Sequence, residues 1–135
     1  MNSFPLKIVT PYGLQFDGQA QELIVRTTTG DLGILAGHIN CVAPLGMGEA
    51  TVMVEDEKRY AACIGGMVSV VDGQVTLVPT TFEWSDSIDV ARADASRQRA
   101  EEILKDKSSS QTDIRLAEAR LKRALIRKNV ARHNK

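Results

Sequence analysis

The residues best suited to chemistry lie in the stretch SIDVARADASRQRAEE, residues 87–102. Its alanine, arginine, glutamate and glutamine content predicts a helix. Asp89, Arg92 and Arg99 then share one helical face, because they stand three and seven positions apart. Guanidinium groups match phosphate oxygens geometrically, and a carboxylate accepts hydrogen bonds from amino or hydroxyl groups. An acid and two guanidiniums on one face therefore indicate a candidate anion site.

A second pair of arginines, Arg123 and Arg127, stands one turn apart on a second predicted helix. If the two helices fold back antiparallel, four guanidinium groups converge, and a polyanion would relieve their repulsion. The alternative is pairing within a helix, such as Arg97 with Glu101 and Arg99 with a neighbouring glutamate, at about 0.2–0.5 kcal/mol per pair. The residues alone favour this alternative.

Other patterns that carry chemistry do not occur in the sequence. The two histidines, His38 and His133, do not stand beside a serine or cysteine in a nucleophile motif. Cys41 and Cys63 lack zinc-ligand spacing and stand in apolar surroundings, which predicts buried free thiols and a reducing compartment. The glycines of TTTGDLGILAGH spell neither a Walker loop nor a dinucleotide fingerprint. We therefore expect no catalytic residue, no metal site and no required cofactor.

Charge is divided unequally along the chain of 135 residues, although its formal sum is zero. Residues 1–88 carry four basic and ten acidic residues, and residues 89–135 carry thirteen basic and seven acidic ones. Such asymmetry is typical of two parts with different partners. Residues 113–135 are basic enough for nucleic acid but contain no aromatic residue to stack on bases. A protein-docking or solvated surface, nucleic acid and a small anion all remain open for this part.

The first part, residues 4 to about 84, has the pattern of β structure. Runs rich in β-branched residues alternate with turns, including an acidic one at Glu55–Asp56–Glu57. The pair Asp72–Gly73 favours a type I′ hairpin turn, and glycines at 46, 48, 65 and 66 predict bends or close backbone approaches. Short strands at this spacing indicate a β-sandwich or flattened barrel. One face of the hairpin would carry Val68, Val70, Val75 and Leu77.

The second part predicts two helices, from Ile88 to about Lys105 and from about Thr112 to Arg132, joined by KDKSSSQTD. Ser87 or Asp89 would cap the first helix. The predicted organisation is a β-sandwich over residues 1–86 and an antiparallel two-helix hairpin over residues 87–135. The hairpin's apolar stripe is thin, so we expect the hairpin to dock on a support. The stripe consists of Ile114, Ala117, Leu121, Ala124 and Leu125.

Membrane and export signals are also missing from the sequence. No apolar run approaches the ~20 residues that span a bilayer, and MNSFPLKIVTP lacks the form of a signal peptide. The sequence therefore predicts a cytoplasmic protein whose membrane role, if any, comes through a partner.

The sequence resembles the epsilon subunits of bacterial F-type ATP synthases over its whole length. GDLGILAGH resembles the family's glycine-rich loop, in which Ala36 replaces the usual proline and should only loosen the turn. CIGGMVSVVDGQVTLV matches the family's Gly-Gly strand and its return strand, and AEARLKRALIRKNVA matches its C-terminal helix. The resemblance implies the β-sandwich and helical hairpin that the residues themselves predict.

The resemblance also implies a non-catalytic role in a rotary motor. The sandwich would bind the gamma subunit and the c-ring, with Asp31 and His38 in the loop at the rotor interface. The hairpin would fold against the sandwich or extend into the alpha/beta catalytic head, where it inhibits ATP hydrolysis. The protein would lie on the cytoplasmic face of the plasma membrane, held there by the complex, with no nucleic acid partner. The alternative is a free β-sandwich module whose basic hairpin binds nucleic acid.

Some bacterial members of the family bind ATP as a regulatory ligand through an Ile/Leu-Asp-x-x-Arg-Ala motif, which IDVARA matches without a mismatch. Glu83 and Arg99 fall on positions that those members also use, whereas the assignment of Arg123 and Arg127 is provisional. The ATP site that the resemblance implies consists of Glu83, Ile88, Asp89, Arg92, Ala93, Arg99, Arg123 and Arg127.

Overall fold

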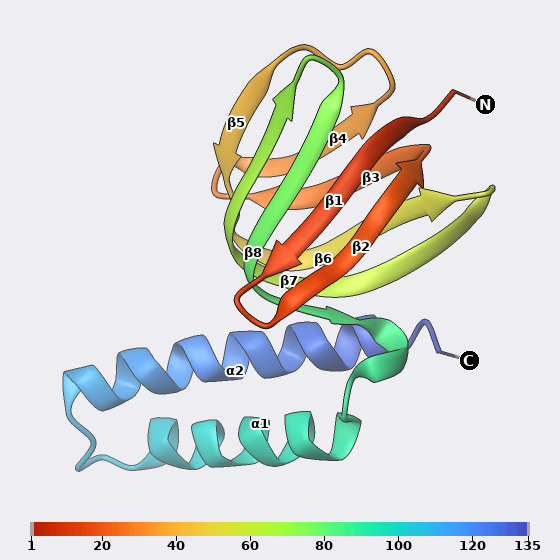
Figure 1. The fold of residues 1–135 in the computed structure, drawn as a ribbon. Coiled ribbons are helices and arrows are strands. Elements are labelled where there is room, and N and C mark those ends of the chain that lie inside the picture. Colours follow the sequence, from red (N-terminus) through yellow and green to blue (C-terminus); the bar gives the residue numbers. More distant parts are fainter. Residues whose placement is uncertain (1, 135) are drawn as a thin grey trace. The chain divides into compact units, whose positions relative to one another are not determined.

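The computed structural model describes residues 2–134, in which eight strands precede two helices (Figure 1). The chain forms two compact units. The boundary between them in the sequence lies between Trp84 and Ser85, where β8 ends. The fold class predicted from the sequence, a β-sandwich followed by a two-helix hairpin, is confirmed. The elements are β1 (Phe4–Thr10), β2 (Gly13–Ala20), β3 (Glu22–Thr27), β4 (Gly30–Leu35), β5 (Cys41–Pro44), β6 (Met47–Val54), β7 (Glu57–Val71), β8 (Gln74–Trp84), a 3-10 turn η1 (Ser85–Ser87), α1 (Val90–Lys105) and α2 (Gln111–Ala131).

The strands form a sheet in the order β2-β1-β8-β7-β6-β3-β4, and β5 pairs with β7. β7 pairs with β6 along its first half and with β5 along its second half, so it runs through both layers of the sandwich. The halves meet at Gly65–Gly66. Gly66 has φ +99°, and a Cβ atom there would lie 2.0 Å from the carbonyl oxygen of Val78. The close backbone approach predicted at this glycine is confirmed.

The core between the layers consists of large aliphatic side chains. Val68 lies opposite Leu77 and Val70 opposite Val75, and all four are buried, as the alternation of the two strands predicts. Burial of one such side chain contributes about 1.5–3 kcal/mol. The sandwich is therefore a strongly supported scaffold. Its fully buried side chains include Leu6, Ile8, Leu23, Val25, Ile34, Val52, Val68 and Leu77.

Two turns of the sandwich have the same conformation. Asp72 and Gly73 have φ +50° and +82°, which confirms the type I′ turn. Glu55 and Asp56 also have positive φ angles, of 52° and 64°, whereas Glu57 already belongs to β7. The acidic turn is held by the side chain of Gln21, which accepts from the backbone N–H of Asp56 at 2.7 Å.

α1 begins at Val90, two residues after the predicted start, because Asp89 is its N-cap. The carboxylate of Asp89 accepts a hydrogen bond from the backbone N–H of Arg92 at 3.0 Å. α2 begins one residue before the predicted start. There Ser110 and Asp113 form a capping box that the sequence analysis did not identify.

α1 and α2 lie side by side and antiparallel (Figure 1). Ala93 and Ala100 are buried on α1, as are Ala117 and Ala124 on α2. The predicted apolar stripe of α2 is correct for Ala117 and Ala124 and wrong for Leu125, which is 43% exposed. Leu125 follows Ala124 by one residue and is thereby turned about 100° away from the seam.

Candidate functional site

The start of α1 holds the predicted motif in a defined conformation. Asp89 and Arg92 are exposed and linked through the N-cap hydrogen bond, and Arg99 is exposed two turns later. Ile88 and Ala93 are buried, the latter in the seam with α2. The charged members of the motif are therefore accessible, whereas its apolar members support the hairpin.

The four predicted arginines lie on one flank of the hairpin. Arg92, Arg99 and Arg123 each precede a seam alanine by one residue, so each is turned about 100° in the same sense from the α1–α2 contact. In an antiparallel pair, the same sense of rotation on both helices leads to the same side. Arg127 lies three residues after Ala124, about 60° from the seam toward that side. The four arginines thus share one side of the hairpin, and their convergence on one ligand stays a prediction.

The heights of these arginines follow from a contact on the opposite flank, where Lys128 Nζ lies 2.8 Å from Asp94 Oδ1. Arg99 stands five residues after Asp94, and Arg123 stands five residues before Lys128. They therefore lie at similar heights along the antiparallel pair, to within the reach of the Lys128 side chain. Arg92 and Arg127 differ in height by about three residues, or roughly 4–5 Å.

The sequence analysis considered ion pairs within α1 for Arg97 and Arg99, and the structure shows such a pair for Arg97. Arg97 donates to Glu101 at 2.7 Å, as predicted. Within residues 2–134, the guanidinium groups of Arg92, Arg99 and Arg123 have no ion-pair partner. The predicted pairing of Arg99 with a neighbouring glutamate is therefore wrong for the described residues. Like charges with no counter-charge are the arrangement that an anion would stabilise.

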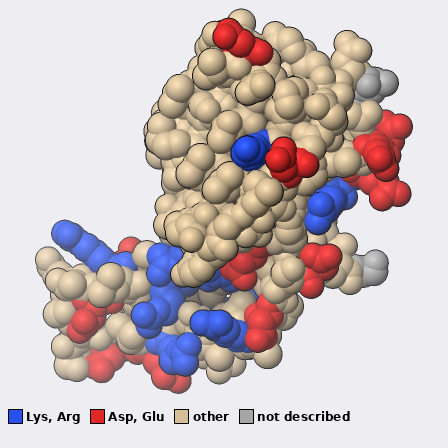
Figure 2. Space-filling model, in the orientation of Figure 1, with Lys and Arg blue, Asp and Glu red and all other residues tan. Residues whose placement is uncertain are grey.

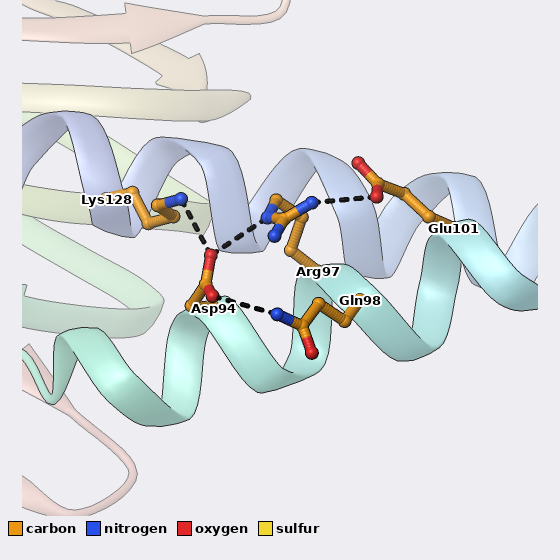
Figure 3. A network of polar contacts seen from close by, with 5 residues as sticks. All are labelled: Asp94, Arg97, Gln98, Glu101 and Lys128. Atoms are coloured by element: carbon orange, nitrogen blue, oxygen red, sulfur yellow. Dashed lines mark hydrogen bonds and ion pairs between the residues drawn. The ribbon is translucent and has the colours of Figure 1, made fainter.

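The opposite flank carries a polar network that the sequence analysis did not predict (Figure 3). Asp94 Oδ1 accepts from Arg97 Nε at 2.9 Å and from Lys128 Nζ at 2.8 Å, and Asp94 Oδ2 accepts from Gln98 at 3.2 Å. The hydrogen bonds from Arg97 and then Lys128 lower the pKa of Asp94 to about 2. The Asp94–Arg97 spacing was visible in the sequence, but the contact with Lys128 depends on the helix register.

Glu83, the remaining residue of the predicted ATP site, lies half-buried on β8, opposite Ala62 of β7. The adjacent Trp84 fixes this end of the strand. Its ring is 4.9 Å from that of Phe82, and the guanidinium of Arg59 lies 3.7 Å from its centroid. These contacts stabilise the end of β8.

Asp31, predicted for the rotor interface, lies exposed on β4 and already has a partner within the chain. It stands opposite Arg26 of β3, with Arg26 Nε 2.6 Å from Asp31 Oδ1. This hydrogen bond raises the pKa of Arg26. The sequence analysis did not pair these residues, although the β3–β4 hairpin between them would have indicated it.

His38, the second residue predicted for that interface, ends a tight turn after β4. Its backbone N–H donates to the carbonyl of Leu35 at 3.2 Å, and Gly37 supplies a φ of +86°. The hydrogen bond between His38 and Leu35 closes the turn, although Ala36 stands where the family usually has proline. The ring Nδ1 lies 2.8 Å from the carbonyl oxygen of Ile39.

The cysteines differ from each other, so the prediction of two buried thiols is half correct. Cys63 is buried, and burial raises the pKa of its thiol to about 12. Cys41 is only half-buried, because it lies on the short strand β5 at one side of β7, and its Sγ lies 4.0 Å from His38 Nδ1.

Among residues 2–134, no group of three or more His, Cys, Asp or Glu side chains is placed to hold a metal ion. No helix in this range has the length and apolar character to cross a membrane.

Family models match both units. The model described as ATP synthase, Delta/Epsilon chain, beta-sandwich domain matches residues 3–85, and that of the long alpha-helix domain matches residues 86–132. The ATP synthase epsilon chain of Ruminococcus albus is 44% identical over 132 residues, 97% of this chain and 98% of that one. That of Bacillus pumilus is 43% identical over 131 residues, 97% of this chain and 98% of the relative.

A solved structure has the same fold. A chain of the Euglena gracilis mitochondrial ATP synthase OSCP/F1/c-ring assembly superposes with a TM-score of 0.77, at 23% identity, over 89% of this chain and 76% of that one.

Proposed function

This chain belongs to the delta/epsilon family of ATP synthase subunits, and we propose that it couples the motor's shaft to its c-ring and regulates ATP hydrolysis through its hairpin. The family membership confirms the resemblance seen in the sequence and the prediction of a non-catalytic central-stalk subunit. It also favours a synthase subunit over a free nucleic-acid-binding module, because the hairpin itself matches the family's long alpha-helix domain. The observation that carries the proposal is this match of both units.

The proposed coupling role rests on the sandwich, whose partners would be the gamma subunit and the c-ring. A rigid, closely packed body is suited to transmit torque, and the exposed Asp31 and the half-buried His38 lie at or just after β4. The protein would then be peripheral, held at the cytoplasmic face of the plasma membrane by the complex. Its other proposed partner is the alpha/beta catalytic head, which the extended hairpin would reach.

The coupling role can be tested in the assembled ATP synthase with Asp31→Ala. We expect this change to weaken retention of the chain on the complex during washing and to reduce ATP-driven proton pumping. Glu57→Ala, which removes an exposed acid at the β6–β7 turn, is the matched control. Equal retention of both variants would show that Asp31 has no part in the rotor interface.

The proposed inhibitory role rests on the charge of the hairpin. Lys and Arg side chains gather in the middle of its visible face, with Asp and Glu side chains around them, whereas the visible face of the sandwich is mainly uncharged (Figure 2). A basic arm would be attracted to acidic surfaces of the catalytic head, and salt would weaken that attraction. ATP synthase depleted of this chain should hydrolyse ATP faster, and re-addition should slow it, less so at high salt. An unchanged rate on re-addition would refute inhibition.

The proposed ATP-sensing role rests on the arginine flank, the side of the hairpin that carries Arg92, Arg99, Arg123 and Arg127. The guanidinium groups of Arg92, Arg99 and Arg123, which have no ion-pair partner within residues 2–134, suit a triphosphate, and the Asp89 carboxylate can accept from an amino or hydroxyl group. A ligand that binds only the folded hairpin stabilises it by mass action. Plentiful ATP would then favour the folded state and relieve inhibition.

Isothermal titration of the full chain with ATP, with and without magnesium, tests the sensor. We expect saturable binding that Arg92→Ala and Arg99→Ala each weaken by about five- to fifty-fold, since hydrogen bonds to charged groups contribute about 1.5–3 kcal/mol before solvent screening. Arg115→Ala is the control, because Arg115 is exposed on α2 and lies nine residues before Ala124, away from the seam. No heat at millimolar ATP would reject the sensor.

A further inference from the structure

The two ends of the helical hairpin are closed in different ways. At one end the chain connects α1 to α2 directly, and local hydrogen bonds fix the connection. Ser109 Oγ donates to the carbonyl of Ile103 at 2.8 Å, and Ser110 caps α2. At the other end no covalent connection holds the last turns of α2 beside the start of α1. Side-chain contacts must therefore hold this open end.

Polar contacts of Lys128 and Asn134 cross the open end. Lys128, in the last turn of α2, donates to Asp94 of α1 across 34 residues of sequence at 2.8 Å (Figure 3). Asn134 donates through its side-chain amide to the carbonyl of Ser85, in the 3-10 turn that precedes α1. Both contacts join the end of the chain to the start of the hairpin, and both lie within one compact unit.

Contacts within α1 orient the Asp94 side chain independently of Lys128. Arg97 and Gln98, from its own helix, donate to its two oxygens, and Arg97 is in turn held by Glu101. A carboxylate oriented in this way loses little side-chain entropy when Lys128 binds. The contact is also only partly exposed, since the Lys128 and Asp94 side chains retain 29% and 34% of their accessible surface.

The opposite flank works against closure. The same antiparallel register that pairs Asp94 with Lys128 places Arg99 and Arg123 at similar heights, and neither has an ion-pair partner within residues 2–134. Apart from Val130 near the end of α2, the residues that the two helices bury are alanines, so the apolar contribution of the seam is small. Attraction on one flank and repulsion on the other therefore act on a weakly packed hairpin.

We propose that the Asp94–Lys128 pair is a latch that sets how readily the hairpin opens at its free end. An anion on the arginine flank cancels the repulsion and acts together with the latch. Loss of the latch shifts the hairpin toward separated helices and lowers its affinity for the anion. This regulatory consequence rests on the proposed function, whereas the latch itself is a property of the isolated chain.

Hydrogen exchange of the full chain tests the latch directly. Lys128→Met removes the charge and keeps most of the stem, and we expect the amides of residues 121–134 to exchange about two- to five-fold faster. Lys122→Met is the matched control, because Lys122 is exposed on the same helix. In an Asp94→Asn background, Lys128→Met should add almost nothing. Equal exchange in the Lys128 and Lys122 variants would overturn the latch, as would full additivity with Asp94→Asn.

The assembled ATP synthase separates failure of the latch from failure of the proposed function. With Lys128→Met, we expect slower ATP hydrolysis at low ATP than with Lys122→Met, because an unlatched hairpin extends more readily. Faster exchange in the isolated chain with unchanged hydrolysis in the complex would support the latch and refute inhibition by the hairpin.

Discussion

Different interactions stabilise the interior of the sandwich and the interior of the hairpin. Leu23, Val52 and Leu77 are among the large side chains that the sandwich buries completely. The two helices of the hairpin bury mainly alanines, with Val130 as the larger exception. Apolar stabilisation grows with the area removed from water, so a leucine contributes several times more than an alanine. The hairpin compensates with helix caps, the inter-helix ion pair of Asp94 and Lys128, and hydrogen bonds.

This difference indicates which part can change conformation. A core of interlocking aliphatic side chains has one well-packed arrangement, and any opening exposes much apolar surface. Two helices joined by alanines and exchangeable polar contacts lose less when they separate, since water replaces the hydrogen bonds. The hairpin is therefore the unit suited to two states, and the sandwich is suited to a fixed position.

The strongest test of this contrast is Leu77→Ala. Leu77 is fully buried, so its truncation should lower the free energy of unfolding of the sandwich by about 2–5 kcal/mol. Urea unfolding followed by the fluorescence of Trp84, which lies in the sandwich, measures the change. Leu116→Ala, at a leucine of α2 that is 62% exposed, should change stability by less than about 0.5 kcal/mol. Similar losses in both variants would contradict the contrast.

A second test enlarges a side chain in the hairpin. Ala100→Leu places a large side chain where none is accommodated, so it should push α1 and α2 apart and cost about 1–3 kcal/mol. Urea unfolding followed by the 222 nm circular dichroism measures the loss of helix. Ala95→Leu, at an exposed position of α1, should be tolerated. A hairpin made more stable by Ala100→Leu would show that the seam is not close-packed.

A smaller effect is expected from Ser110→Ala at the start of α2. This change removes the hydroxyl that accepts from the backbone N–H of Asp113 at 3.1 Å and should cost about 1 kcal/mol of helix stability. Thermal melting of the helical signal gives the value. Thr112→Ala, at an exposed first-turn residue, is the control and should be neutral or slightly stabilising. If both variants melt alike, the capping box contributes nothing.

The smallest effect is a dependence on acid pH. The pKa of Asp94 in the folded hairpin, about 2, lies below its ordinary value of 3.8, so the unfolded chain takes up the proton first. The stabilisation from Asp94 is therefore present above about pH 4 and is lost as the pH falls toward 2. Helicity between pH 5 and 2 should fall more in the natural chain than in Asp94→Asn. Identical acid profiles would show that this carboxylate does not support the hairpin.

Much of this architecture was predictable because its signals are local. The Asp72–Gly73 turn, the alternation around Val68 and Leu77 and the Asp89 cap each depend on residues within a few positions of one another. The candidate motif at 88–93 was recognisable for the same reason. The missed capping box at Ser110 was also local, but the serines before it obscured where the helix starts.

The sequence by itself determined where the strands, turns and helices form, which arginines share a helical face and how charge divides between the two parts. Only the tertiary structure decided that Cys41 is half-buried and that Lys128 reaches Asp94. These outcomes depend on which strand lies beside which and on the register of two helices. Register is set by packing summed over many residues, so no short stretch of sequence encodes it.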